Sequence, residues 1–424
     1  ARSPIVNIVG DHAVSHRTLD APLASDLAGF AKPVSKWIKS ADTADAVGEA
    51  AAEAVAVAQE AAAGVATLIL PADTAWSPSK GPAAPVAVRP APAPDEGAVA
   101  AAKAALAFGD RSALLLSDPV LMEEGLDLAA AIAMKTGARI YCDTFVGRMQ
   151  RGAGRPMVRR LPYFAEAVEE ELKGVQHLVL VSTKPPVAFF AYPGRRGALT
   201  PEGAEVVTLA RQDEDALAGL GALAEAVGAK DAMVVRSRVP DAPSGELDAM
   251  KAGAIVARHL PEGAIVSDEG ATSSAGAFIA TAGAAPHDWL QLTGGSIGQG
   301  LPVAVGAATA CPGRKTICLE GDGSAMYTIQ SLWTAARENL DLCAVIFANR
   351  SYAILKVEMM RTGAQNPGPK TLAMYDLTNP EIGFVELAKG MGVDGVRVDT
   401  AEAFEAVFAA AMKTRGPFLI EAVI

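Results

Sequence analysis

Residues 320–349 read E-G-D-G-S-A-M-Y-T-I-Q-S-L-W-T-A-A-R-E-N-L-D-L-C-A-V-I-F-A-N. Residues 316–319, just before them, form a short apolar run that predicts a strand, and a glycine-rich acidic turn ends it. Residues 330–339 are typical of a helix, and residues 343–348 are an uninterrupted apolar run, as in a buried strand of a parallel sheet. The stretch therefore predicts a strand, a helix and a second strand in one parallel β-α-β unit.

Two residues with oxygen-bearing side chains follow these strands. A right-handed crossover places the strands side by side, so Asp322 and Asn349 are expected at the same carboxyl edge of the sheet. Gly321 and Gly323 flank Asp322 and let the backbone approach a polyanion. Mg²⁺ suits such a site, because it takes few protein oxygens and shares its remaining coordination shell with phosphate and water.

Length and composition agree with an α/β protein of several domains. A chain of 424 residues is too long for one ordinary domain and suggests two or three. The net charge of −11 argues against nucleic acid or an anionic membrane as the main partner. No secretory signal or membrane-spanning run is evident, and the four cysteines are scattered without metal-site spacing. We therefore expect reduced thiols in a cytoplasmic protein.

Two proline-containing segments divide the chain. Residues 77–95 are too rich in proline for a helix or a central strand and predict an extended linker, and residues 236–246 form a second boundary. The three pieces, 1–76, 96–235 and 247–424, each alternate strands with helices, which predicts an α/β fold of three doubly wound parallel-sheet domains. Strands are expected at residues 5–9, 65–70, 113–116, 139–142, 177–181, 206–209, 264–267 and 417–424.

The central piece lacks the sequence of a nucleotide site. The turn after its first strand reads L-L-S-D-P-V (residues 115–120) and not G-x-G-x-x-G. Residues 147–154 are rich in glycine and arginine, but their spacing does not match a phosphate-binding loop. We interpret this piece as a structural domain and do not expect it to bind FAD.

The combination of G-D-G at residues 321–323 with Asn349 resembles the cofactor motif of thiamine-diphosphate enzymes. The three-part order is similar to that of acetohydroxyacid synthase, pyruvate oxidase and benzoylformate decarboxylase. The last of these shares the pattern G-D-G-S-A-x-Y-x-I-x-x-L-W-T-A-A, here residues 321–336. The segments S-P-I-V-N-I-V-G-D-H (3–12) and K-P-V-S-K-W (32–37) resemble the second half of a pyrimidine-binding domain.

The resemblance implies that residues 1–76 are the C-terminal half of the pyrimidine-binding domain, that 96–235 are the central domain and that 247–424 bind diphosphate and Mg²⁺. The first domain is then incomplete, by roughly 90 residues or half a usual domain. In this family a glutamate of the first half hydrogen-bonds the aminopyrimidine ring and drives proton removal from the thiazolium carbon. The glutamates at 49, 53 and 60 lie too late in the fold to replace it, so the catalytic residue is unknown. Either the chain is a fragment or further residues precede it.

For the C-terminal domain the resemblance implies a specific ligand set. Asp322 and Asn349 bind Mg²⁺ through side-chain oxygens, and the backbone carbonyl of Ser351 is the third protein ligand. Diphosphate is expected to meet the backbone at Gly321, Gly323, Ser324 and Ala325. Tyr352 either donates its hydroxyl to the diphosphate or packs in the core. Thr272, after the strand at 264–267, either clamps phosphate or helps to cap the next helix.

The resemblance also assigns a role to the turn T-G-G-S-I-G-Q-G-L-P, residues 293–302. Family members place a bulky apolar residue there, which holds the two cofactor rings in a V shape. The corresponding residue is Ile297. When the cofactor is bent in this way, its amino group reaches its reactive carbon. The protein thus sets the geometry of the cofactor before the reaction begins.

Residues 352–361, Y-A-I-L-K-V-E-M-M-R, are expected to line the substrate pocket. Relative to benzoylformate decarboxylase, Leu355 keeps an apolar position and Glu358 replaces an aromatic residue. Our hypothesis is that this carboxylate disfavours an aryl ring and favours a hydroxylated or cationic side chain. The alternative is that Glu358 faces solvent on an exposed helix face. The five histidines offer no convincing catalytic pair.

We therefore expect a thiamine-diphosphate and Mg²⁺ dependent 2-oxo acid decarboxylase or carboligase, either benzoylformate decarboxylase-like or acetolactate synthase-like. In this family the active site lies between two subunits, which implies a homodimer or homotetramer. Two alternatives remain. One is a flavin-containing oxidase or synthase on the same scaffold, and the other is a catalytically incompetent protein that only binds thiamine diphosphate.

Overall fold

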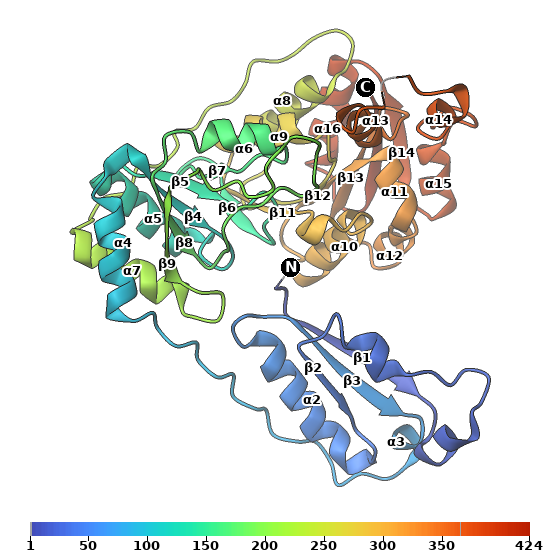
Figure 1. The fold of residues 1–424 in the computed structure, drawn as a ribbon. Helices are drawn as coiled ribbons and strands as arrows, with labels where there is room; N and C mark the ends of the chain where they lie inside the picture. The colour runs from blue at the N-terminus through green and yellow to red at the C-terminus, as the bar shows by residue number, and fades with distance from the viewer. Residues whose placement is uncertain (1, 365) are drawn as a thin grey trace.

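The computed structural model describes residues 2–364 and 366–424. Within these residues the chain forms three sheets, whose strand orders are β1-β3-β2, β7-β5-β4-β8-β9 and β14-β15-β13-β12-β10-β11-β6. Every pairing of neighbouring strands is parallel except that of β11 with β6. The predicted α/β class with parallel sheets is thus confirmed (Figure 1).

The first sheet lies in an N-terminal unit that Figure 1 shows apart from the rest of the chain. Its strands and helices are β1 (Ile5–Asp11), η1 (Val14–Leu19), α1 (Leu27–Ala31), β2 (Trp37–Ser40), α2 (Ala44–Gln59), β3 (Val65–Pro71) and α3 (Asp73–Trp76). Thr43 caps α2, and the alanines of this helix pack closely on the sheet because they have almost no side-chain volume. Residues 77–94 contain neither helix nor strand and run from this unit to the next.

The second sheet forms the centre of the middle unit. Its strands and helices are α4 (Glu96–Leu106), η2 (Gly109–Arg111), β4 (Ser112–Leu116), α5 (Glu123–Thr136), β5 (Arg139–Cys142), β7 (Arg159–Arg160), α6 (Ala165–Glu171), β8 (His177–Val181), β9 (Glu205–Ala210) and α7 (Ala216–Val227). All five residues of β4 are buried, as expected of the central strand in a sheet covered on both faces.

The third sheet begins after an irregular segment. Its strands and helices are α8 (Ala249–His259), β10 (Ile265–Glu269), α9 (Ala275–Ala280), η3 (Thr281–Gly283), β11 (His287–Gln291), η4 (Thr293–Gly295), α10 (Gly300–Ala310), β12 (Thr316–Gly321), α11 (Asp322–Thr328), α12 (Ser331–Arg337), β13 (Leu342–Ala348), α13 (Ala353–Arg361), α14 (Pro369–Ala373), α15 (Phe384–Gly390), β14 (Asp394–Val398), α16 (Ala401–Ala411) and β15 (Phe418–Val423). The helix predicted at 330–339 is preceded by α11, which starts directly after β12.

One strand of the middle unit crosses into this third sheet. β6 (Met149–Arg151) pairs antiparallel with β11, and the guanidinium of Arg151 stacks on the Phe278 ring with its central carbon 3.7 Å from the ring centroid. The same side chain donates to the Phe278 carbonyl across 2.6 Å. The middle and C-terminal units are therefore joined by a shared sheet and by buried contacts.

Among the helices of residues 2–364 and 366–424, none combines the length and the apolar composition that crossing a membrane requires.

Candidate functional site

The carboxyl ends of β10, β12 and β13 form one edge of the third sheet. The strands are adjacent and in register, with Glu269 of β10 opposite Glu320 of β12 and Gly321 opposite Phe347 of β13. Asp322 and Asn349 follow directly after β12 and β13. The predicted convergence of the two strand ends is therefore what the fold produces.

Asp322 is buried, with 4% of its surface exposed. Its Oδ1 accepts a hydrogen bond from the Gly323 N–H at 2.7 Å, and its Oδ2 accepts one from the Arg350 N–H at 2.6 Å. Burial raises the pKa of Asp322, and these N–H donors oppose the shift. A buried carboxylate at the edge of a sheet gains from a bound cation, because the cation offsets the cost of removing the charge from water.

Asn349 and Ser351 lie beside it on the loop after β13. Asn349 Oδ1 accepts from the Ser351 N–H at 2.9 Å, and the Ser351 hydroxyl donates to the Tyr375 carbonyl at 2.9 Å. The described residues contain no cluster of three or more His, Cys, Asp or Glu side chains that could hold a metal. The donors at this edge are instead one carboxylate, one amide oxygen and backbone carbonyls, a set that suits a hard cation sharing its shell with other oxygens.

The start of α11 is closely fitted to the same loop. A Cβ on Gly323 would lie 2.5 Å from Cε1 of Tyr352, so only glycine allows the tyrosine ring to pack there. The Gly323 N–H is already bonded to Asp322, and Ala325 is buried. The N-cap residue Gly321 has no side chain to bond the first turn of α11, so apart from the Gly323 N–H the N–H groups of this turn are available to an anion.

Thr272 is exposed in the turn between β10 and α9. Ser274 occupies the N-cap position of α9, and its side chain makes no capping hydrogen bond. Helix capping by this serine therefore does not explain the run of hydroxyl residues after β10.

The glycine-rich turn at 293–302 faces open space on one side. Gly294 and Gly295 have φ of 68° and 65°, and a Cβ on either would meet nothing within 4 Å. Ile297 follows with 40% of its surface exposed. Gly298 has φ of 98° and packs against α11, where a Cβ would lie 2.8 Å from Tyr327 Cβ. The turn thus presents an exposed apolar side chain on a backbone that a flat ligand can approach.

Two buried glutamates lie beneath this turn, and sequence reasoning gave them no role. The Glu269 carboxylate accepts the backbone N–H groups of Gly298 and Gly300, and it is 1% exposed. Burial raises its pKa, against the opposing effect of these donors. Burial and then the neighbouring Glu269 charge raise the pKa of Glu320 well above the usual range. The acidic residue at the end of β10 was the signal that could have identified the pair.

Glu358 and Leu355 lie on α13, and the two differ in exposure. Leu355 is 47% exposed. Glu358 Oε2 accepts a hydrogen bond from the Tyr192 hydroxyl of the middle unit at 2.7 Å, and its Oε1 is buried without a partner among the described residues. The alternative of a solvent-facing Glu358 is therefore wrong, because the middle unit covers this helix face. Arg361 reinforces the junction by pairing with Glu166, whose pKa it lowers to about 2.

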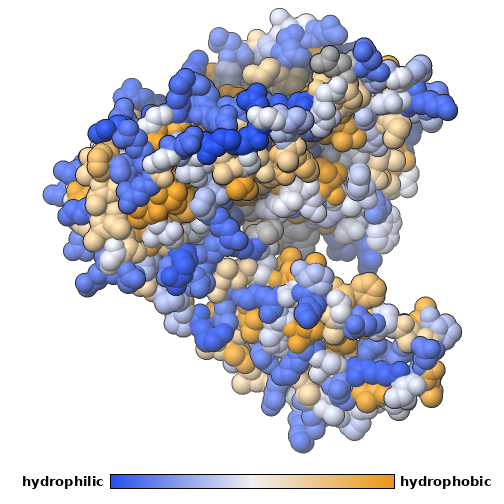
Figure 2. All heavy atoms as spheres, in the orientation of Figure 1, coloured by the Kyte–Doolittle hydropathy of each residue, from blue (hydrophilic) through white to orange (hydrophobic). Residues whose placement is uncertain are grey.

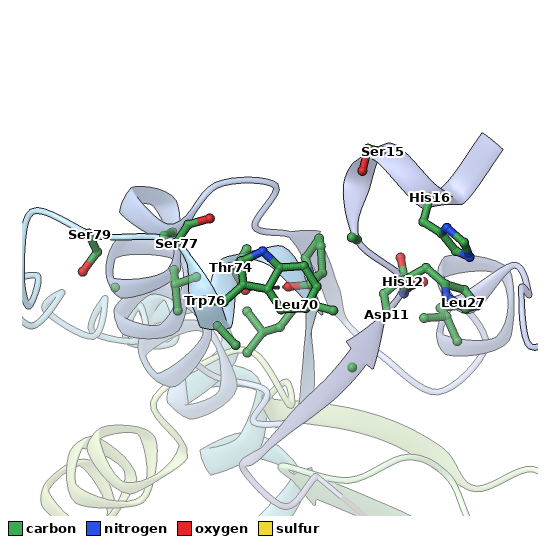
Figure 3. A pocket seen from close by; sticks show the side chains of 18 of the residues that line it. Asp11, His12, Ser15, His16, Leu27, Leu70, Thr74, Trp76, Ser77 and Ser79 are labelled. Carbon is green, nitrogen blue, oxygen red and sulfur yellow. Dashed lines mark hydrogen bonds between the residues drawn. The ribbon is translucent and has the colours of Figure 1, made fainter. Parts of the chain in front are cut away.

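A second candidate region is a cavity of about 1430 Å³ at the carboxyl ends of β1 and β3 in the N-terminal unit. Figure 3 shows Leu70, Thr74 and Trp76 on one side, with His12 and His16 on the other. The two imidazole rings lie 5.2 Å apart between centroids. The structure thus brings together a histidine pair that the sequence analysis did not single out, although their spacing of four residues was a usable signal.

Two of the three glutamates in residues 1–76, Glu53 and Glu60, make contacts within the N-terminal unit and with the linker. Glu53 accepts from Trp37 Nε1 at 3.2 Å and pairs with Lys39 at 2.7 Å. Glu60 pairs with Arg89 of the linker at 2.7 Å. These contacts attach α2 to β2 and to the linker.

The crevice between β4 and β8 is filled from within the chain. Strand order reverses there, the position where α/β sheets usually bind nucleotides. The Arg2 guanidinium donates to the Ser182 carbonyl at 2.7 Å and to Ser117 Oγ at 2.8 Å, and the Asp143 carboxylate lies alongside.

Comparison with known proteins places this geometry in a family. Residues 270–422 match the family model described as "Thiamine pyrophosphate enzyme, C-terminal TPP binding domain". Over 427 aligned residues the chain is 47% identical to the Mycobacterium tuberculosis (strain H37Rv) protein named "Putative acetolactate synthase large subunit IlvX", covering 100% of this chain and 82% of that protein. The chain belongs to the family of thiamine-diphosphate-dependent enzymes that includes such acetolactate synthase-like proteins.

Other relatives agree over shorter or more divergent matches. Benzoylformate decarboxylase of Pseudomonas aeruginosa is 34% identical over 137 residues, which cover 32% of this chain and 24% of that enzyme. The solved thiamine diphosphate-dependent 4-hydroxybenzoylformate decarboxylase of Rhodococcus jostii RHA1 superposes with a TM-score of 0.81 at 25% identity, covering 99% of this chain and 82% of that one. The resemblance inferred from the G-D-G and asparagine motif is thus confirmed.

Proposed function

We propose that the protein uses thiamine diphosphate and Mg²⁺ to decarboxylate a 2-oxo acid, and that it then protonates the remaining acyl unit or transfers it to an aldehyde or a second oxo acid. The proposal rests on one observation above the others. Asp322 and Asn349 follow adjacent parallel strands, and the 2.6 Å bond from the Arg350 N–H to Asp322 holds the loop after β13 against the start of α11.

The residues present suit the diphosphate end of this cofactor. Asp322, Asn349 and the Ser351 carbonyl would hold Mg²⁺, which in turn binds diphosphate oxygens. The first turn of α11, with Ser324, would meet the phosphates through the N–H groups that Asp322 does not bond, while Tyr352 and Thr272 border the same edge.

The rings of the cofactor fit the glycine-rich turn. Gly294 and Gly295 leave open space, and Ile297 offers an exposed apolar contact that would keep the two rings bent toward each other. When bound, thiamine diphosphate would supply a nucleophilic thiazolium carbon and a cationic ring that can take up the electron pair released with CO₂. The chain's own part is to bind, orient and exclude water at this edge.

The proposed active form contains at least two copies of the chain, as a homodimer or homotetramer. Large apolar side chains are exposed on both outer units, among them Ile8 (69%), Phe30 (76%) and Trp76 (71%) on the first and Tyr327 (64%) on the third. Figure 2 shows such apolar side chains interspersed with hydrophilic ones on the visible face of the N-terminal unit. In the proposed assembly some of these side chains would be buried between copies of the chain. Sedimentation analysis with and without the cofactor would measure the assembly.

The contents of the crevice between β4 and β8 argue against the flavin-containing alternative, so we expect the protein to be colourless. Arg2 occupies it, and the carboxylate of Asp143 borders it and would repel a pyrophosphate. A flavin spectrum in the purified protein would reverse this conclusion.

The test is a calorimetric titration of the protein with thiamine diphosphate, in Mg²⁺ and then in excess chelator, followed by CO₂ release from pyruvate, benzoylformate and 4-hydroxybenzoylformate. We expect binding that requires Mg²⁺ and turnover of at least one acid. Absence of binding would refute the proposal. Metal-dependent binding without turnover of any acid would favour the alternative of a protein that only binds the cofactor.

A further inference from the structure

Glu269 is the last residue of β10 and lies in the interior of the C-terminal unit. Only 1% of its surface is exposed, and its register partner on β12 is Glu320, which is equally buried. Two neighbouring carboxyl groups in the interior are costly to ionise, because each is removed from water and a charge on one disfavours a charge on the other. Such an arrangement calls for a specific set of compensating contacts.

Those contacts come from the glycine-rich turn. The Glu269 carboxylate accepts the backbone N–H groups of Gly298 and Gly300, one on each of its oxygens. Hydrogen bonds between an ionised acceptor and backbone N–H groups are stronger than neutral ones, and two of them on one carboxylate fix both position and orientation. Burial of the carboxylate is thereby offset by bonds to the segment that directly follows Ile297.

The geometry leaves the turn little freedom on this side. A Cβ on Gly300 would overlap the side chains of Glu269 and Glu320, so the backbone lies directly against them. On the opposite side the Thr328 hydroxyl of α11 donates to the Gly298 carbonyl at 2.8 Å. The peptide after Ile297 is therefore held by two contacts: Glu269 accepts its N–H groups, and Thr328 of α11 donates to the Gly298 carbonyl.

We propose that Glu269 is a positioning residue, which holds the 297–300 backbone so that Ile297 presents its side chain to the rings of the bound cofactor. The inference rests on the proposed function, because it assigns the rings to this turn. It predicts that Glu269 matters for the ring end of the ligand and not for the diphosphate end at Asp322 and Asn349.

The experiment compares two ligands on the full chain. Thiamine diphosphate and inorganic pyrophosphate, each with Mg²⁺, are titrated into wild type, Glu269→Gln and the control Glu262→Gln, which makes the same change at an exposed site of the same unit. In Glu269→Gln an amide N–H₂ faces a backbone N–H, so one bond to the turn is lost. We expect about a tenfold weaker affinity for thiamine diphosphate, with pyrophosphate affinity unchanged. The control should match wild type for both ligands.

The outcomes separate the inference from the proposed function. Failure of wild type to bind thiamine diphosphate would refute the proposed function itself. Wild-type binding with equal affinity in Glu269→Gln would overturn the positioning role alone, and so would an equal loss of both ligands, which would mark a general structural role. Glu269→Asp, which keeps the charge but shortens the side chain, should show the same selective loss. Failure of both variants to fold would assign Glu269 to core stability and overturn the inference.

Discussion

The backbone N–H of Arg350 donates to Oδ2 of Asp322 across 2.6 Å and ties the start of α11 to the loop that follows β13. The neighbouring residues make further local bonds: the Gly323 N–H donates to Asp322 Oδ1 within α11, and Asn349 Oδ1 accepts from the Ser351 N–H within the loop after β13. Because the strands below are in register, the bond fixes where the two oxygen-bearing side chains lie.

Replacement of Asp322 by Ala should remove metal-dependent cofactor binding. The substitution deletes the only carboxylate of the proposed ligand set, so we expect thiamine diphosphate affinity in Mg²⁺ to fall by about tenfold or more. Calorimetric titration measures this directly. Asp394→Ala, at an exposed position of β14, is the matched control. Unchanged affinity in Asp322→Ala would exclude this residue as a metal ligand.

A methyl group on Gly298 should disturb the turn that carries Ile297. The residue has φ of 98°, and the added Cβ would lie 2.8 Å from Tyr327 Cβ, so Gly298→Ala is expected to destabilise the protein by about 1–3 kcal/mol. Gly306→Ala is the control, because it lies in α10 with nothing within 4 Å of an added Cβ. That change should stabilise the helix by about 0.5–1 kcal/mol. Urea unfolding of both variants tests the pair, and equal effects would contradict the strained geometry.

The buried imidazole of His287 should make stability depend on pH. Burial, together with the nearby charge of Arg151, lowers the pKa of His287 from 6.5 to about 4. The unfolded chain then takes up a proton at a higher pH than the folded chain. The stability associated with neutral His287 is therefore present above pH 6.5 and is lost as pH falls toward 4.

His287→Gln removes this titration. Between pH 6.5 and about pH 4 the free energy of unfolding of wild type should fall by up to about 1.4 kcal/mol more per pH unit than that of the variant, which corresponds to one proton. Denaturant unfolding at a series of pH values gives both slopes. Parallel curves would show that His287 does not titrate in the folded protein with the lowered pKa.

The hydrogen bond between Tyr192 and Glu358 should couple the middle unit to α13. A double-mutant cycle with Tyr192→Phe and Glu358→Gln should give a coupling free energy of about 1–2 kcal/mol, as for a partly buried bond to a charged group. Unfolding measurements on the four proteins provide it. Independent effects of the two substitutions would show that the bond adds nothing to stability.

The same pair allows a test of substrate choice. Glu358→Phe is expected to shift preference toward aryl 2-oxo acids if the carboxylate borders the substrate pocket. Tyr192→Phe separates this from a purely structural effect, because it breaks the bond and keeps the carboxylate. Competition between pyruvate and benzoylformate gives the readout, and an unchanged preference in Glu358→Phe would refute the substrate role.

Local sequence patterns determined the β-α-β unit around Asp322 and Asn349. Uninterrupted apolar runs specify buried strands, and the handedness of the crossover then decides which edge receives both residues. The proline-rich composition of residues 77–95 likewise defines the segment between the first two units. The strands, the crossover and the linker depend on residues that are close together in the sequence, so they can be inferred without the tertiary structure.

Only the tertiary structure decided the contacts between distant segments. Tyr192 and Glu358 lie 166 residues apart, and β6 joins β11 from another unit. Glu269 meets the turn at Gly298 because β10 and α10 pack together, and no local pattern encodes that distance. Each of these partners is selected by how whole elements pack, since a side chain's own sequence neighbourhood does not specify what the folded chain brings against it.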